Sequence, residues 1–154
     1  MTILHGTQAI AAIEAEEHRT LSYPERRIVM LEGYADEPYR CSAGVLTCGV
    51  GQTGVWLDKT FLESFAHHVQ RAAKRLPGLA EMPEYLQTEL VQAEYRGDLG
   101  MSPKACSHIK ASNWKAAAHE FLDHKEYKNP NCPAQIKRRI EAVHHALMLR
   151  SVQY

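Results

Sequence analysis

Apolar residues recur at helical spacing over most of the chain, and the spacing is interrupted by clear stop signals. Ser22 with Glu25, and Thr60 with Glu63, have the spacing of capping boxes and so mark two helix starts. The helix that begins at Thr60 is expected to be the longest. The pattern predicts helices over residues 7–18, 22–32, 60–76, 83–95, 103–110 and 113–122, and a last helix after Pro133.

One stretch, residues 33–54, does not fit a helix. Four of the nine glycines lie between positions 44 and 54, with valine, leucine and threonine among them, which is typical of short strands and tight turns. The sequence therefore predicts an α+β fold, mostly helical with a small β-hairpin lobe and an interlobe cleft for a ligand. We expect one domain over residues 1–154, with an N-terminal extension at 1–20, the hairpin lobe at 33–54 and the helical lobe at 58–154.

The length and net charge of the chain exclude some classes of function. The chain has 154 residues, the size of one domain, and its 18 basic and 18 acidic residues cancel. A neutral chain is not suited to broad attraction to nucleic acid or anionic lipid, so we expect neither partner. The most apolar early run, Ala9–Ile13, is followed at once by acidic residues, so we expect no membrane anchor and no signal peptide. Four cysteines without a CxxC pair predict free thiols and synthesis in the cytoplasm.

Two short segments resemble nucleotide-binding and metal-binding motifs, but the residues around them do not support either kind of site. Residues 49–54 fit G-x-G-x-x-G, but helices follow where a dinucleotide-binding fold needs alternating strands and helices. His119 and His124 are five residues apart, which separates them by about 140° around a helix and prevents chelation of one ion. The histidine pairs at 67–68 and 144–145 diverge in the same way and are expected to be solvated. We therefore expect no cofactor and no metal.

An acid at a helix end, Glu32, is followed in the hairpin by two reactive side chains, Cys41 and Thr47. The spacings between these three residues are nine and six. Each residue has an ordinary structural interpretation when it is taken alone. Together with the glycines the pattern reads Glu-Gly-x5-Tyr-x-Cys-x2-Gly-x2-Thr-x-Gly-x-Gly-x-Thr-Gly. This pattern resembles the bacteriophage-type lysozymes, the muramidase family that includes phage endolysins. The resemblance covers residues 32–54, and the later helices agree with the family in number and order.

The resemblance implies a role for each matching residue. Glu32 stands at the position of the general acid. Cys41 stands where most members have Asp and some have Cys, and Thr47 stands where a threonine helps to hold the attacking water. Gly51 and Thr53 stand at positions expected to bind substrate.

Two neighbouring features bear on this assignment. Asp36 and Glu37 are rival second carboxylates, but their place beside Pro38 suggests an exposed loop and ranks them below Cys41. Gln52 replaces the histidine that the family usually carries, which implies a more loosely packed hairpin and unchanged chemistry.

The function that the resemblance implies is hydrolysis of the β-1,4 bond between N-acetylmuramic acid and N-acetylglucosamine by a monomeric, cofactor-free glycoside hydrolase. Its partner is bacterial peptidoglycan, reached in the periplasm after release or delivery. A thiol at position 41 leaves both water activation and direct attack on the sugar open. The alternative is a catalytically weak protein of lysozyme fold that binds glycan or a partner in a virion. Attraction to the anionic wall would need local basic clusters, at residues 71–75 or 137–139, and each cluster is equally well explained as a solvated helix face.

Overall fold

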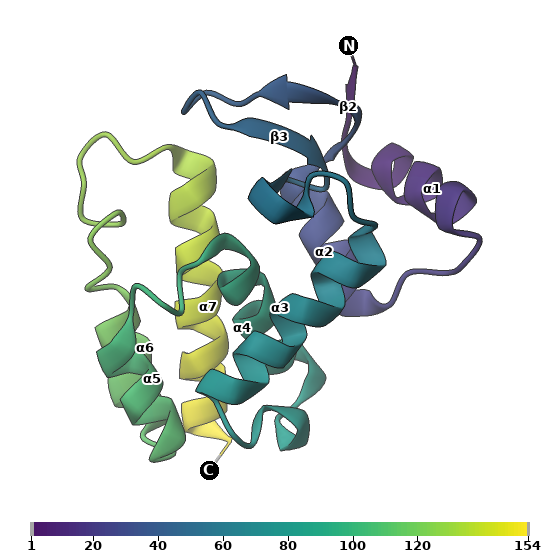
Figure 1. Cartoon of the computed structure of the whole chain (residues 1–154). Helices are drawn as coiled ribbons and strands as arrows, with labels where there is room; N and C mark the ends of the chain where they lie inside the picture. Colours follow the sequence, from purple (N-terminus) through teal and green to yellow (C-terminus); the bar gives the residue numbers. More distant parts are fainter. Residues whose placement is uncertain (1, 154) are drawn as a thin grey trace. The chain divides into compact units, whose positions relative to one another are not determined.

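A computed structural model describes residues 2–153, and its elements follow the predicted order (Figure 1). The α+β class and each predicted helix are confirmed. The helices are α1 (Gly6–Glu17), α2 (Tyr23–Glu32), α3 (Phe61–Arg75), α4 (Glu84–Arg96), α5 (Pro103–Lys110), α6 (Trp114–Phe121) and α7 (Ala134–Val152). The strands are β1 (Ile3–Leu4), β2 (Tyr34–Arg40), β3 (Leu46–Gly49) and β4 (Gln52–Thr53), and short 3-10 turns cover Gly54–Trp56 and Leu79–Glu81.

The relative lengths of two helices differ from expectation. Helix α7 has 19 residues and α3 has 15, so the prediction that α3 is the longest is wrong. Pro77 and Gly78 follow α3 closely, whereas no proline or glycine interrupts α7 after Pro133. No helix among residues 2–153 is both long enough and apolar enough to cross a membrane.

Contacts divide the described residues into two compact units, one up to His67 and one from His68. The division falls inside α3 rather than at residue 58. Residues 3–17, expected within an N-terminal extension, form β1 and α1 of the first unit: β1 pairs with β2, and α1 packs on α2. The single-domain organisation over residues 1–154 stays a prediction.

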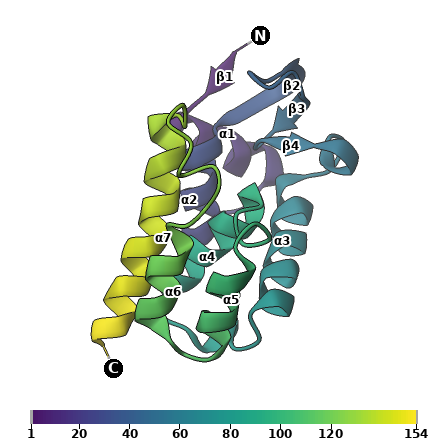
Figure 2. The same cartoon turned by 90° about the vertical axis from the view of Figure 1, so that its left-hand side faces the viewer.

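The first unit contains a four-stranded antiparallel sheet in the order β1-β2-β3-β4, visible in Figure 2. Tyr39 of β2 lies opposite Thr47 of β3, which in turn lies opposite Thr53 of β4. The register of β2 and β3 shifts between Ala35 and Tyr39. Pro38, which has no N–H to donate, lies within this irregular stretch.

Both predicted capping boxes are present. Ser22 N donates to Glu25 Oε1 at 3.1 Å, and Glu25 N donates to Ser22 Oγ at 3.4 Å. Burial raises the pKa of Glu25, but hydrogen bonds from Arg19 and Ser22 outweigh it and hold that pKa below its ordinary value. At the start of α3, Thr60 N donates to Glu63 Oε2 at 2.9 Å, and Glu63 N donates to Thr60 Oγ1 at 3.1 Å. These local bonds fix where α2 and α3 begin.

The second unit packs its helices around α7, which contacts α6 and α4, while α5 contacts α6. A polar pair lies within this interior: Arg139 Nε donates to Gln92 Oε1 at 3.1 Å, and Gln92 Nε2 donates to the Arg139 carbonyl at 3.1 Å. Reciprocal bonds of this kind satisfy groups that would otherwise be costly to bury. The core of the unit includes Leu86, Leu90, Leu99, Phe121, Ile140, Val143 and Leu147.

Candidate active site

Glu32 is the last residue of α2, and its carboxylate lies against the backbone of the β3–β4 turn. Gly33 follows with φ 76° and donates its N–H to the Val29 carbonyl at 2.8 Å, which ends the helix. A Cβ atom added to Gly51 would lie 2.4 Å from Glu32 Oε1, and Gly51 itself has φ 62°. Only glycine meets both the left-handed conformation and the close approach of the carboxylate. Gly51 therefore leaves free the space that the Glu32 carboxylate occupies.

Cys41 begins the turn between β2 and β3. Its N–H donates to the Val45 carbonyl at 3.0 Å, and its carbonyl accepts from Gly44 N at 2.8 Å. The backbone N–H groups of Val45 and Ala43, and then the Thr47 hydroxyl, lower the pKa of the Cys41 thiol. Nearby donors favour the thiolate form of a cysteine. The turn therefore favours negative charge at Cys41.

Thr47 is buried, and its Oγ1 lies 2.9 Å from the Val45 carbonyl. A hydroxyl has one proton to donate, and this bond uses it. Thr53, directly across on β4, is exposed. Tyr39, Thr47 and Thr53 therefore share one face of the sheet, because directly paired residues lie on the same side, and Cys41 follows Tyr39 by two residues.

Tyr39 connects this face to Glu32. Burial raises the pKa of its phenol, and the negative charges of Cys41, Glu32 and Cys48 raise it further. Tyr39 lies opposite Thr47 in the ladder and two residues before Cys41. The structure therefore brings the three predicted catalytic residues, Glu32, Cys41 and Thr47, into one region of the first unit, and their catalytic roles stay predictions.

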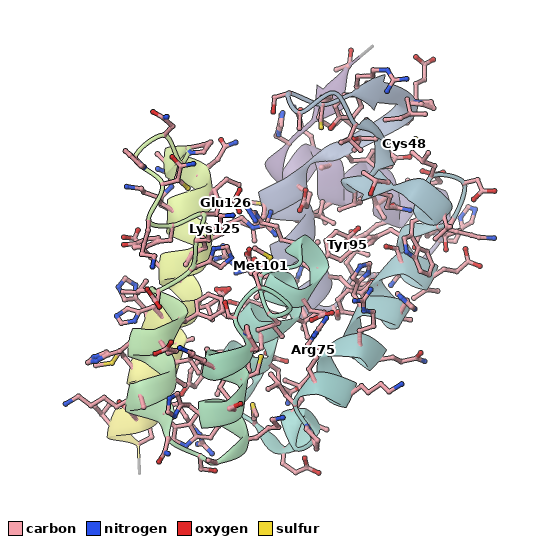
Figure 3. The ribbon with its side chains drawn as sticks, turned by 60° about the vertical axis from the view of Figure 1, so that its left-hand side comes forward. Cys48, Arg75, Tyr95, Met101, Lys125 and Glu126 are labelled. Carbon is pink, nitrogen blue, oxygen red and sulfur yellow. The ribbon has the colours of Figure 1, made fainter. Side chains whose placement is uncertain are left out.

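The other face of the hairpin is different in character. Cys48 follows Thr47 directly in β3, so its side chain points to the opposite face, where its Sγ lies 3.7 Å from the Ala35 carbonyl. It lines a cavity of about 480 Å³ together with Tyr34, Asp36 and Gln52. Figure 3 marks Cys48 on the sheet. Cys41 and Cys48 are both free thiols, and their places on opposite faces separate their sulfurs.

Gln52 was expected to loosen the hairpin, and this expectation is wrong. Its side chain is buried, and its Oε1 accepts a hydrogen bond from Val50 N at 3.1 Å. Its Nε2 donates to the Trp56 carbonyl at 2.9 Å and to the Lys59 carbonyl at 2.8 Å. An amide supplies one acceptor and two donors, and all are used here. Gln52 therefore ties β4 to the segment that precedes α3.

The rival carboxylates occupy a strand rather than a loop. Asp36 and Glu37 lie in β2, and both are exposed, so their predicted exposure is confirmed and the predicted loop is wrong. Asp36 lines the cavity on the Cys48 face. That position separates Asp36 from the face that carries Cys41 and Thr47.

A second cluster of ionisable groups, in the second unit, was not predicted. Ligand atoms of Asp98, His124 and Glu126 lie within 4.8 Å of one another. Arg96 already bridges the two acids, at 2.9 Å to Asp98 and 2.5 Å to Glu126, and Figure 3 marks Glu126 beside Lys125. His124 Nε2 lies 3.0 Å from Asp98 Oδ1, and its Nδ1 accepts from Glu126 N at 3.1 Å. With both ring nitrogens engaged and a guanidinium between the acids, the cluster is an ion-pair network rather than a set of metal ligands.

The histidine geometry also differs from expectation, because α6 ends at Phe121 and leaves His124 outside the helix. The expected separation of about 140° around a helix therefore does not hold for His119 and His124. Neither histidine pair is simply solvated: His144 Nδ1 lies 2.7 Å from the Ala118 carbonyl, and the His68 ring lies 4.7 Å from that of Tyr95.

Comparison with solved structures identifies the architecture. The active form of the P1 phage endolysin Lyz superposes with a TM-score of 0.67, covering 97% of this chain and 96% of that chain at 14% sequence identity. The chain has the fold of that endolysin. No protein-family model matches the sequence, and a search of curated proteins finds no match. The lysozyme-like α+β fold is therefore shown by structure, and the chemistry has to be argued from the residues.

Proposed function

We propose that this protein is a lysozyme of the phage endolysin type, which hydrolyses the β-1,4 bond between N-acetylmuramic acid and N-acetylglucosamine in bacterial peptidoglycan. The observation that carries the proposal is the environment of Cys41. Cys41 begins the β2–β3 turn, where backbone N–H groups and the Thr47 hydroxyl lower the pKa of its thiol, in the same unit that holds the Glu32 carboxylate against Gly51. A proton donor and an anionic group on one surface are what glycoside hydrolysis requires.

In the proposed reaction Glu32 gives its proton to the glycosidic oxygen as the bond between that oxygen and the anomeric carbon breaks. A water held by the Thr47 hydroxyl adds to the anomeric carbon, and its proton passes to the Cys41 thiolate. Proton exchange with solvent then returns Glu32 and Cys41 to their starting forms. Water activation of this kind inverts the anomeric centre, whereas attack by Cys41 on the sugar would retain it.

The rest of the site fits the same proposal. Thr53 is exposed beside Thr47 and can hydrogen-bond the saccharide, and Gly51 keeps the sugar-facing turn clear of side chain. The proposed chemistry uses side chains and water alone, so it needs no cofactor or metal. The proposed site of action is the cell wall in the periplasm, for host lysis or wall penetration, with the protein working as a monomer.

The test is the identity of the products. Purified peptidoglycan is incubated with the protein, reduced with borohydride and analysed by mass spectrometry, beside a sample without protein. The proposal predicts fragments whose reduced end is N-acetylmuramic acid. Fragments reduced at N-acetylglucosamine would indicate a different glycosidase. Sedimentation of the protein with the wall, without new reducing ends, would indicate the glycan-binding alternative.

A further inference from the structure

A row of hydroxyl groups crosses three strands beside the proposed catalytic residues. Tyr39, Thr47 and Thr53 are directly paired in register from β2 through β3 to β4. Neighbouring strands lie about 4.8 Å apart, so paired side chains on one face form a line perpendicular to the strands. Cys41 lies two residues after Tyr39, on the same face. The row begins at Tyr39, whose phenol is electrostatically coupled to both Glu32 and Cys41.

The hydroxyl groups of this row differ in whether their protons are already donated to another group of the protein. The single Thr47 proton is donated to the Val45 carbonyl. The Tyr39 hydroxyl makes no hydrogen bond to any residue in the described range 2–153. The phenol also stays protonated at neutral pH, because burial and the nearby negative charges oppose its ionisation. Tyr39 therefore holds an uncommitted donor directly opposite Thr47 and two residues before Cys41.

We propose that Tyr39 is a substrate-positioning residue, whose hydroxyl donates a hydrogen bond to an oxygen of the saccharide bound beside Glu32 and Cys41. The inference rests on the proposed function and deepens it. Every sugar ring presents hydroxyl and acetamido oxygens, which are acceptors that lose water when a glycan binds. A donor with no internal partner can replace that water without breaking a bond of the protein. The bond would orient the ring, while Glu32 and Cys41 perform the chemistry.

The matched pair of variants is Tyr39→Phe and Tyr34→Phe. Both remove one phenolic oxygen from β2, but the Tyr34 hydroxyl donates to Glu16 on the cavity face of the sheet. Tyr39→Phe is expected to lower kcat/KM for peptidoglycan about tenfold, the scale of one lost neutral hydrogen bond, with no change in Tm. Tyr34→Phe is expected to lower Tm and to leave kcat/KM of the folded protein unchanged. Binding of an N-acetylglucosamine tetramer, followed by NMR, should weaken in Tyr39→Phe alone.

Each other outcome has a definite meaning. If the wild type does not cleave peptidoglycan, the proposed function fails, and the tetramer titration still decides the role of Tyr39. If the wild type cleaves and Tyr39→Phe matches it in rate and in tetramer binding, the inference about Tyr39 is overturned and the proposed function stands. A joint loss of Tm and activity in Tyr39→Phe would assign the hydroxyl a structural role and overturn the inference. A shift in the pH at which iodoacetamide alkylates Cys41 would show that the phenol acts on the thiol instead of the sugar, which also overturns it.

Discussion

The two faces of the β2–β3 hairpin each carry a free cysteine, and the surroundings of the two thiols differ. On one face, backbone N–H groups and a hydroxyl lower the pKa of Cys41. On the other face, the Cys48 thiol lies against the Ala35 carbonyl, in a cavity that it shares with Tyr34 and Gln52. The two thiols therefore differ in the backbone groups beside them, and we expect only Cys41 to take part in the chemistry.

The largest expected effect compares the two cysteines directly. Cys41→Ala should reduce the rate of wall lysis on the order of a hundredfold to ten-thousandfold, because it removes the group proposed to activate water. Cys48→Ala is the matched control and should keep nearly the full rate. Cys41→Asp should also preserve activity, since a carboxylate can take the same role. Lysis is followed as the loss of turbidity of a cell-wall suspension, and Tm is measured for each variant. Full activity in Cys41→Ala would remove Cys41 from the mechanism.

The next largest effect tests the face of the hairpin that lines the cavity, where Gln52 lies opposite Cys48 in the ladder. Gln52→Ala removes three hydrogen bonds and should lower the free energy of unfolding by about 3 kcal/mol, at roughly 1 kcal/mol for each bond. The control is Gln70→Ala, an exposed glutamine in α3, which should change it by less than about 0.5 kcal/mol. Urea unfolding measures both. Equal stabilities of the two variants would mean that Gln52 does not anchor the hairpin.

A smaller effect tests the contact between the turn and Glu32. Gly51→Ala and Gly54→Ala both place a side chain at a left-handed φ, 62° and 57°, at a cost of about 1 kcal/mol each. A Cβ at Gly54 meets no atom within 4 Å, whereas one at Gly51 would collide with the Glu32 carboxylate. Both variants should therefore lose similar stability, and only Gly51→Ala should lose lytic rate, by about tenfold, as displacement of a reacting group is costly. Equal lytic rates would show that the position of Glu32 does not depend on Gly51.

Local signals in the sequence predicted local structure well. The capping boxes at Ser22 and Thr60 are satisfied within three residues, so spacing alone identified where α2 and α3 begin. The pattern of glycines and threonines placed the hairpin and grouped Glu32, Cys41 and Thr47. These are features that neighbouring residues determine.

What the sequence did not predict depends on residues that are distant or on exact register. The shift between β2 and β3 decides that Tyr39 lies opposite Thr47, and alternation along a strand cannot reveal such an irregularity. The network of Asp98 and His124 joins positions 26 residues apart. Gln52 was misjudged because its partners, the carbonyls of Trp56 and Lys59, become acceptors for it only once the following turn has folded.

The most direct test of the central claim compares two carboxylates of the first unit. Glu32→Gln and Glu37→Gln remove the same charge, one at the proposed site and one on the exposed part of β2. Initial rates of turbidity loss are measured on the same cell-wall suspension, with Tm measured to confirm folding. The account predicts that Glu32→Gln loses on the order of a hundredfold to ten-thousandfold in rate while Glu37→Gln stays within about twofold of the wild type. A folded Glu32→Gln variant that clears the wall at the wild-type rate would contradict it.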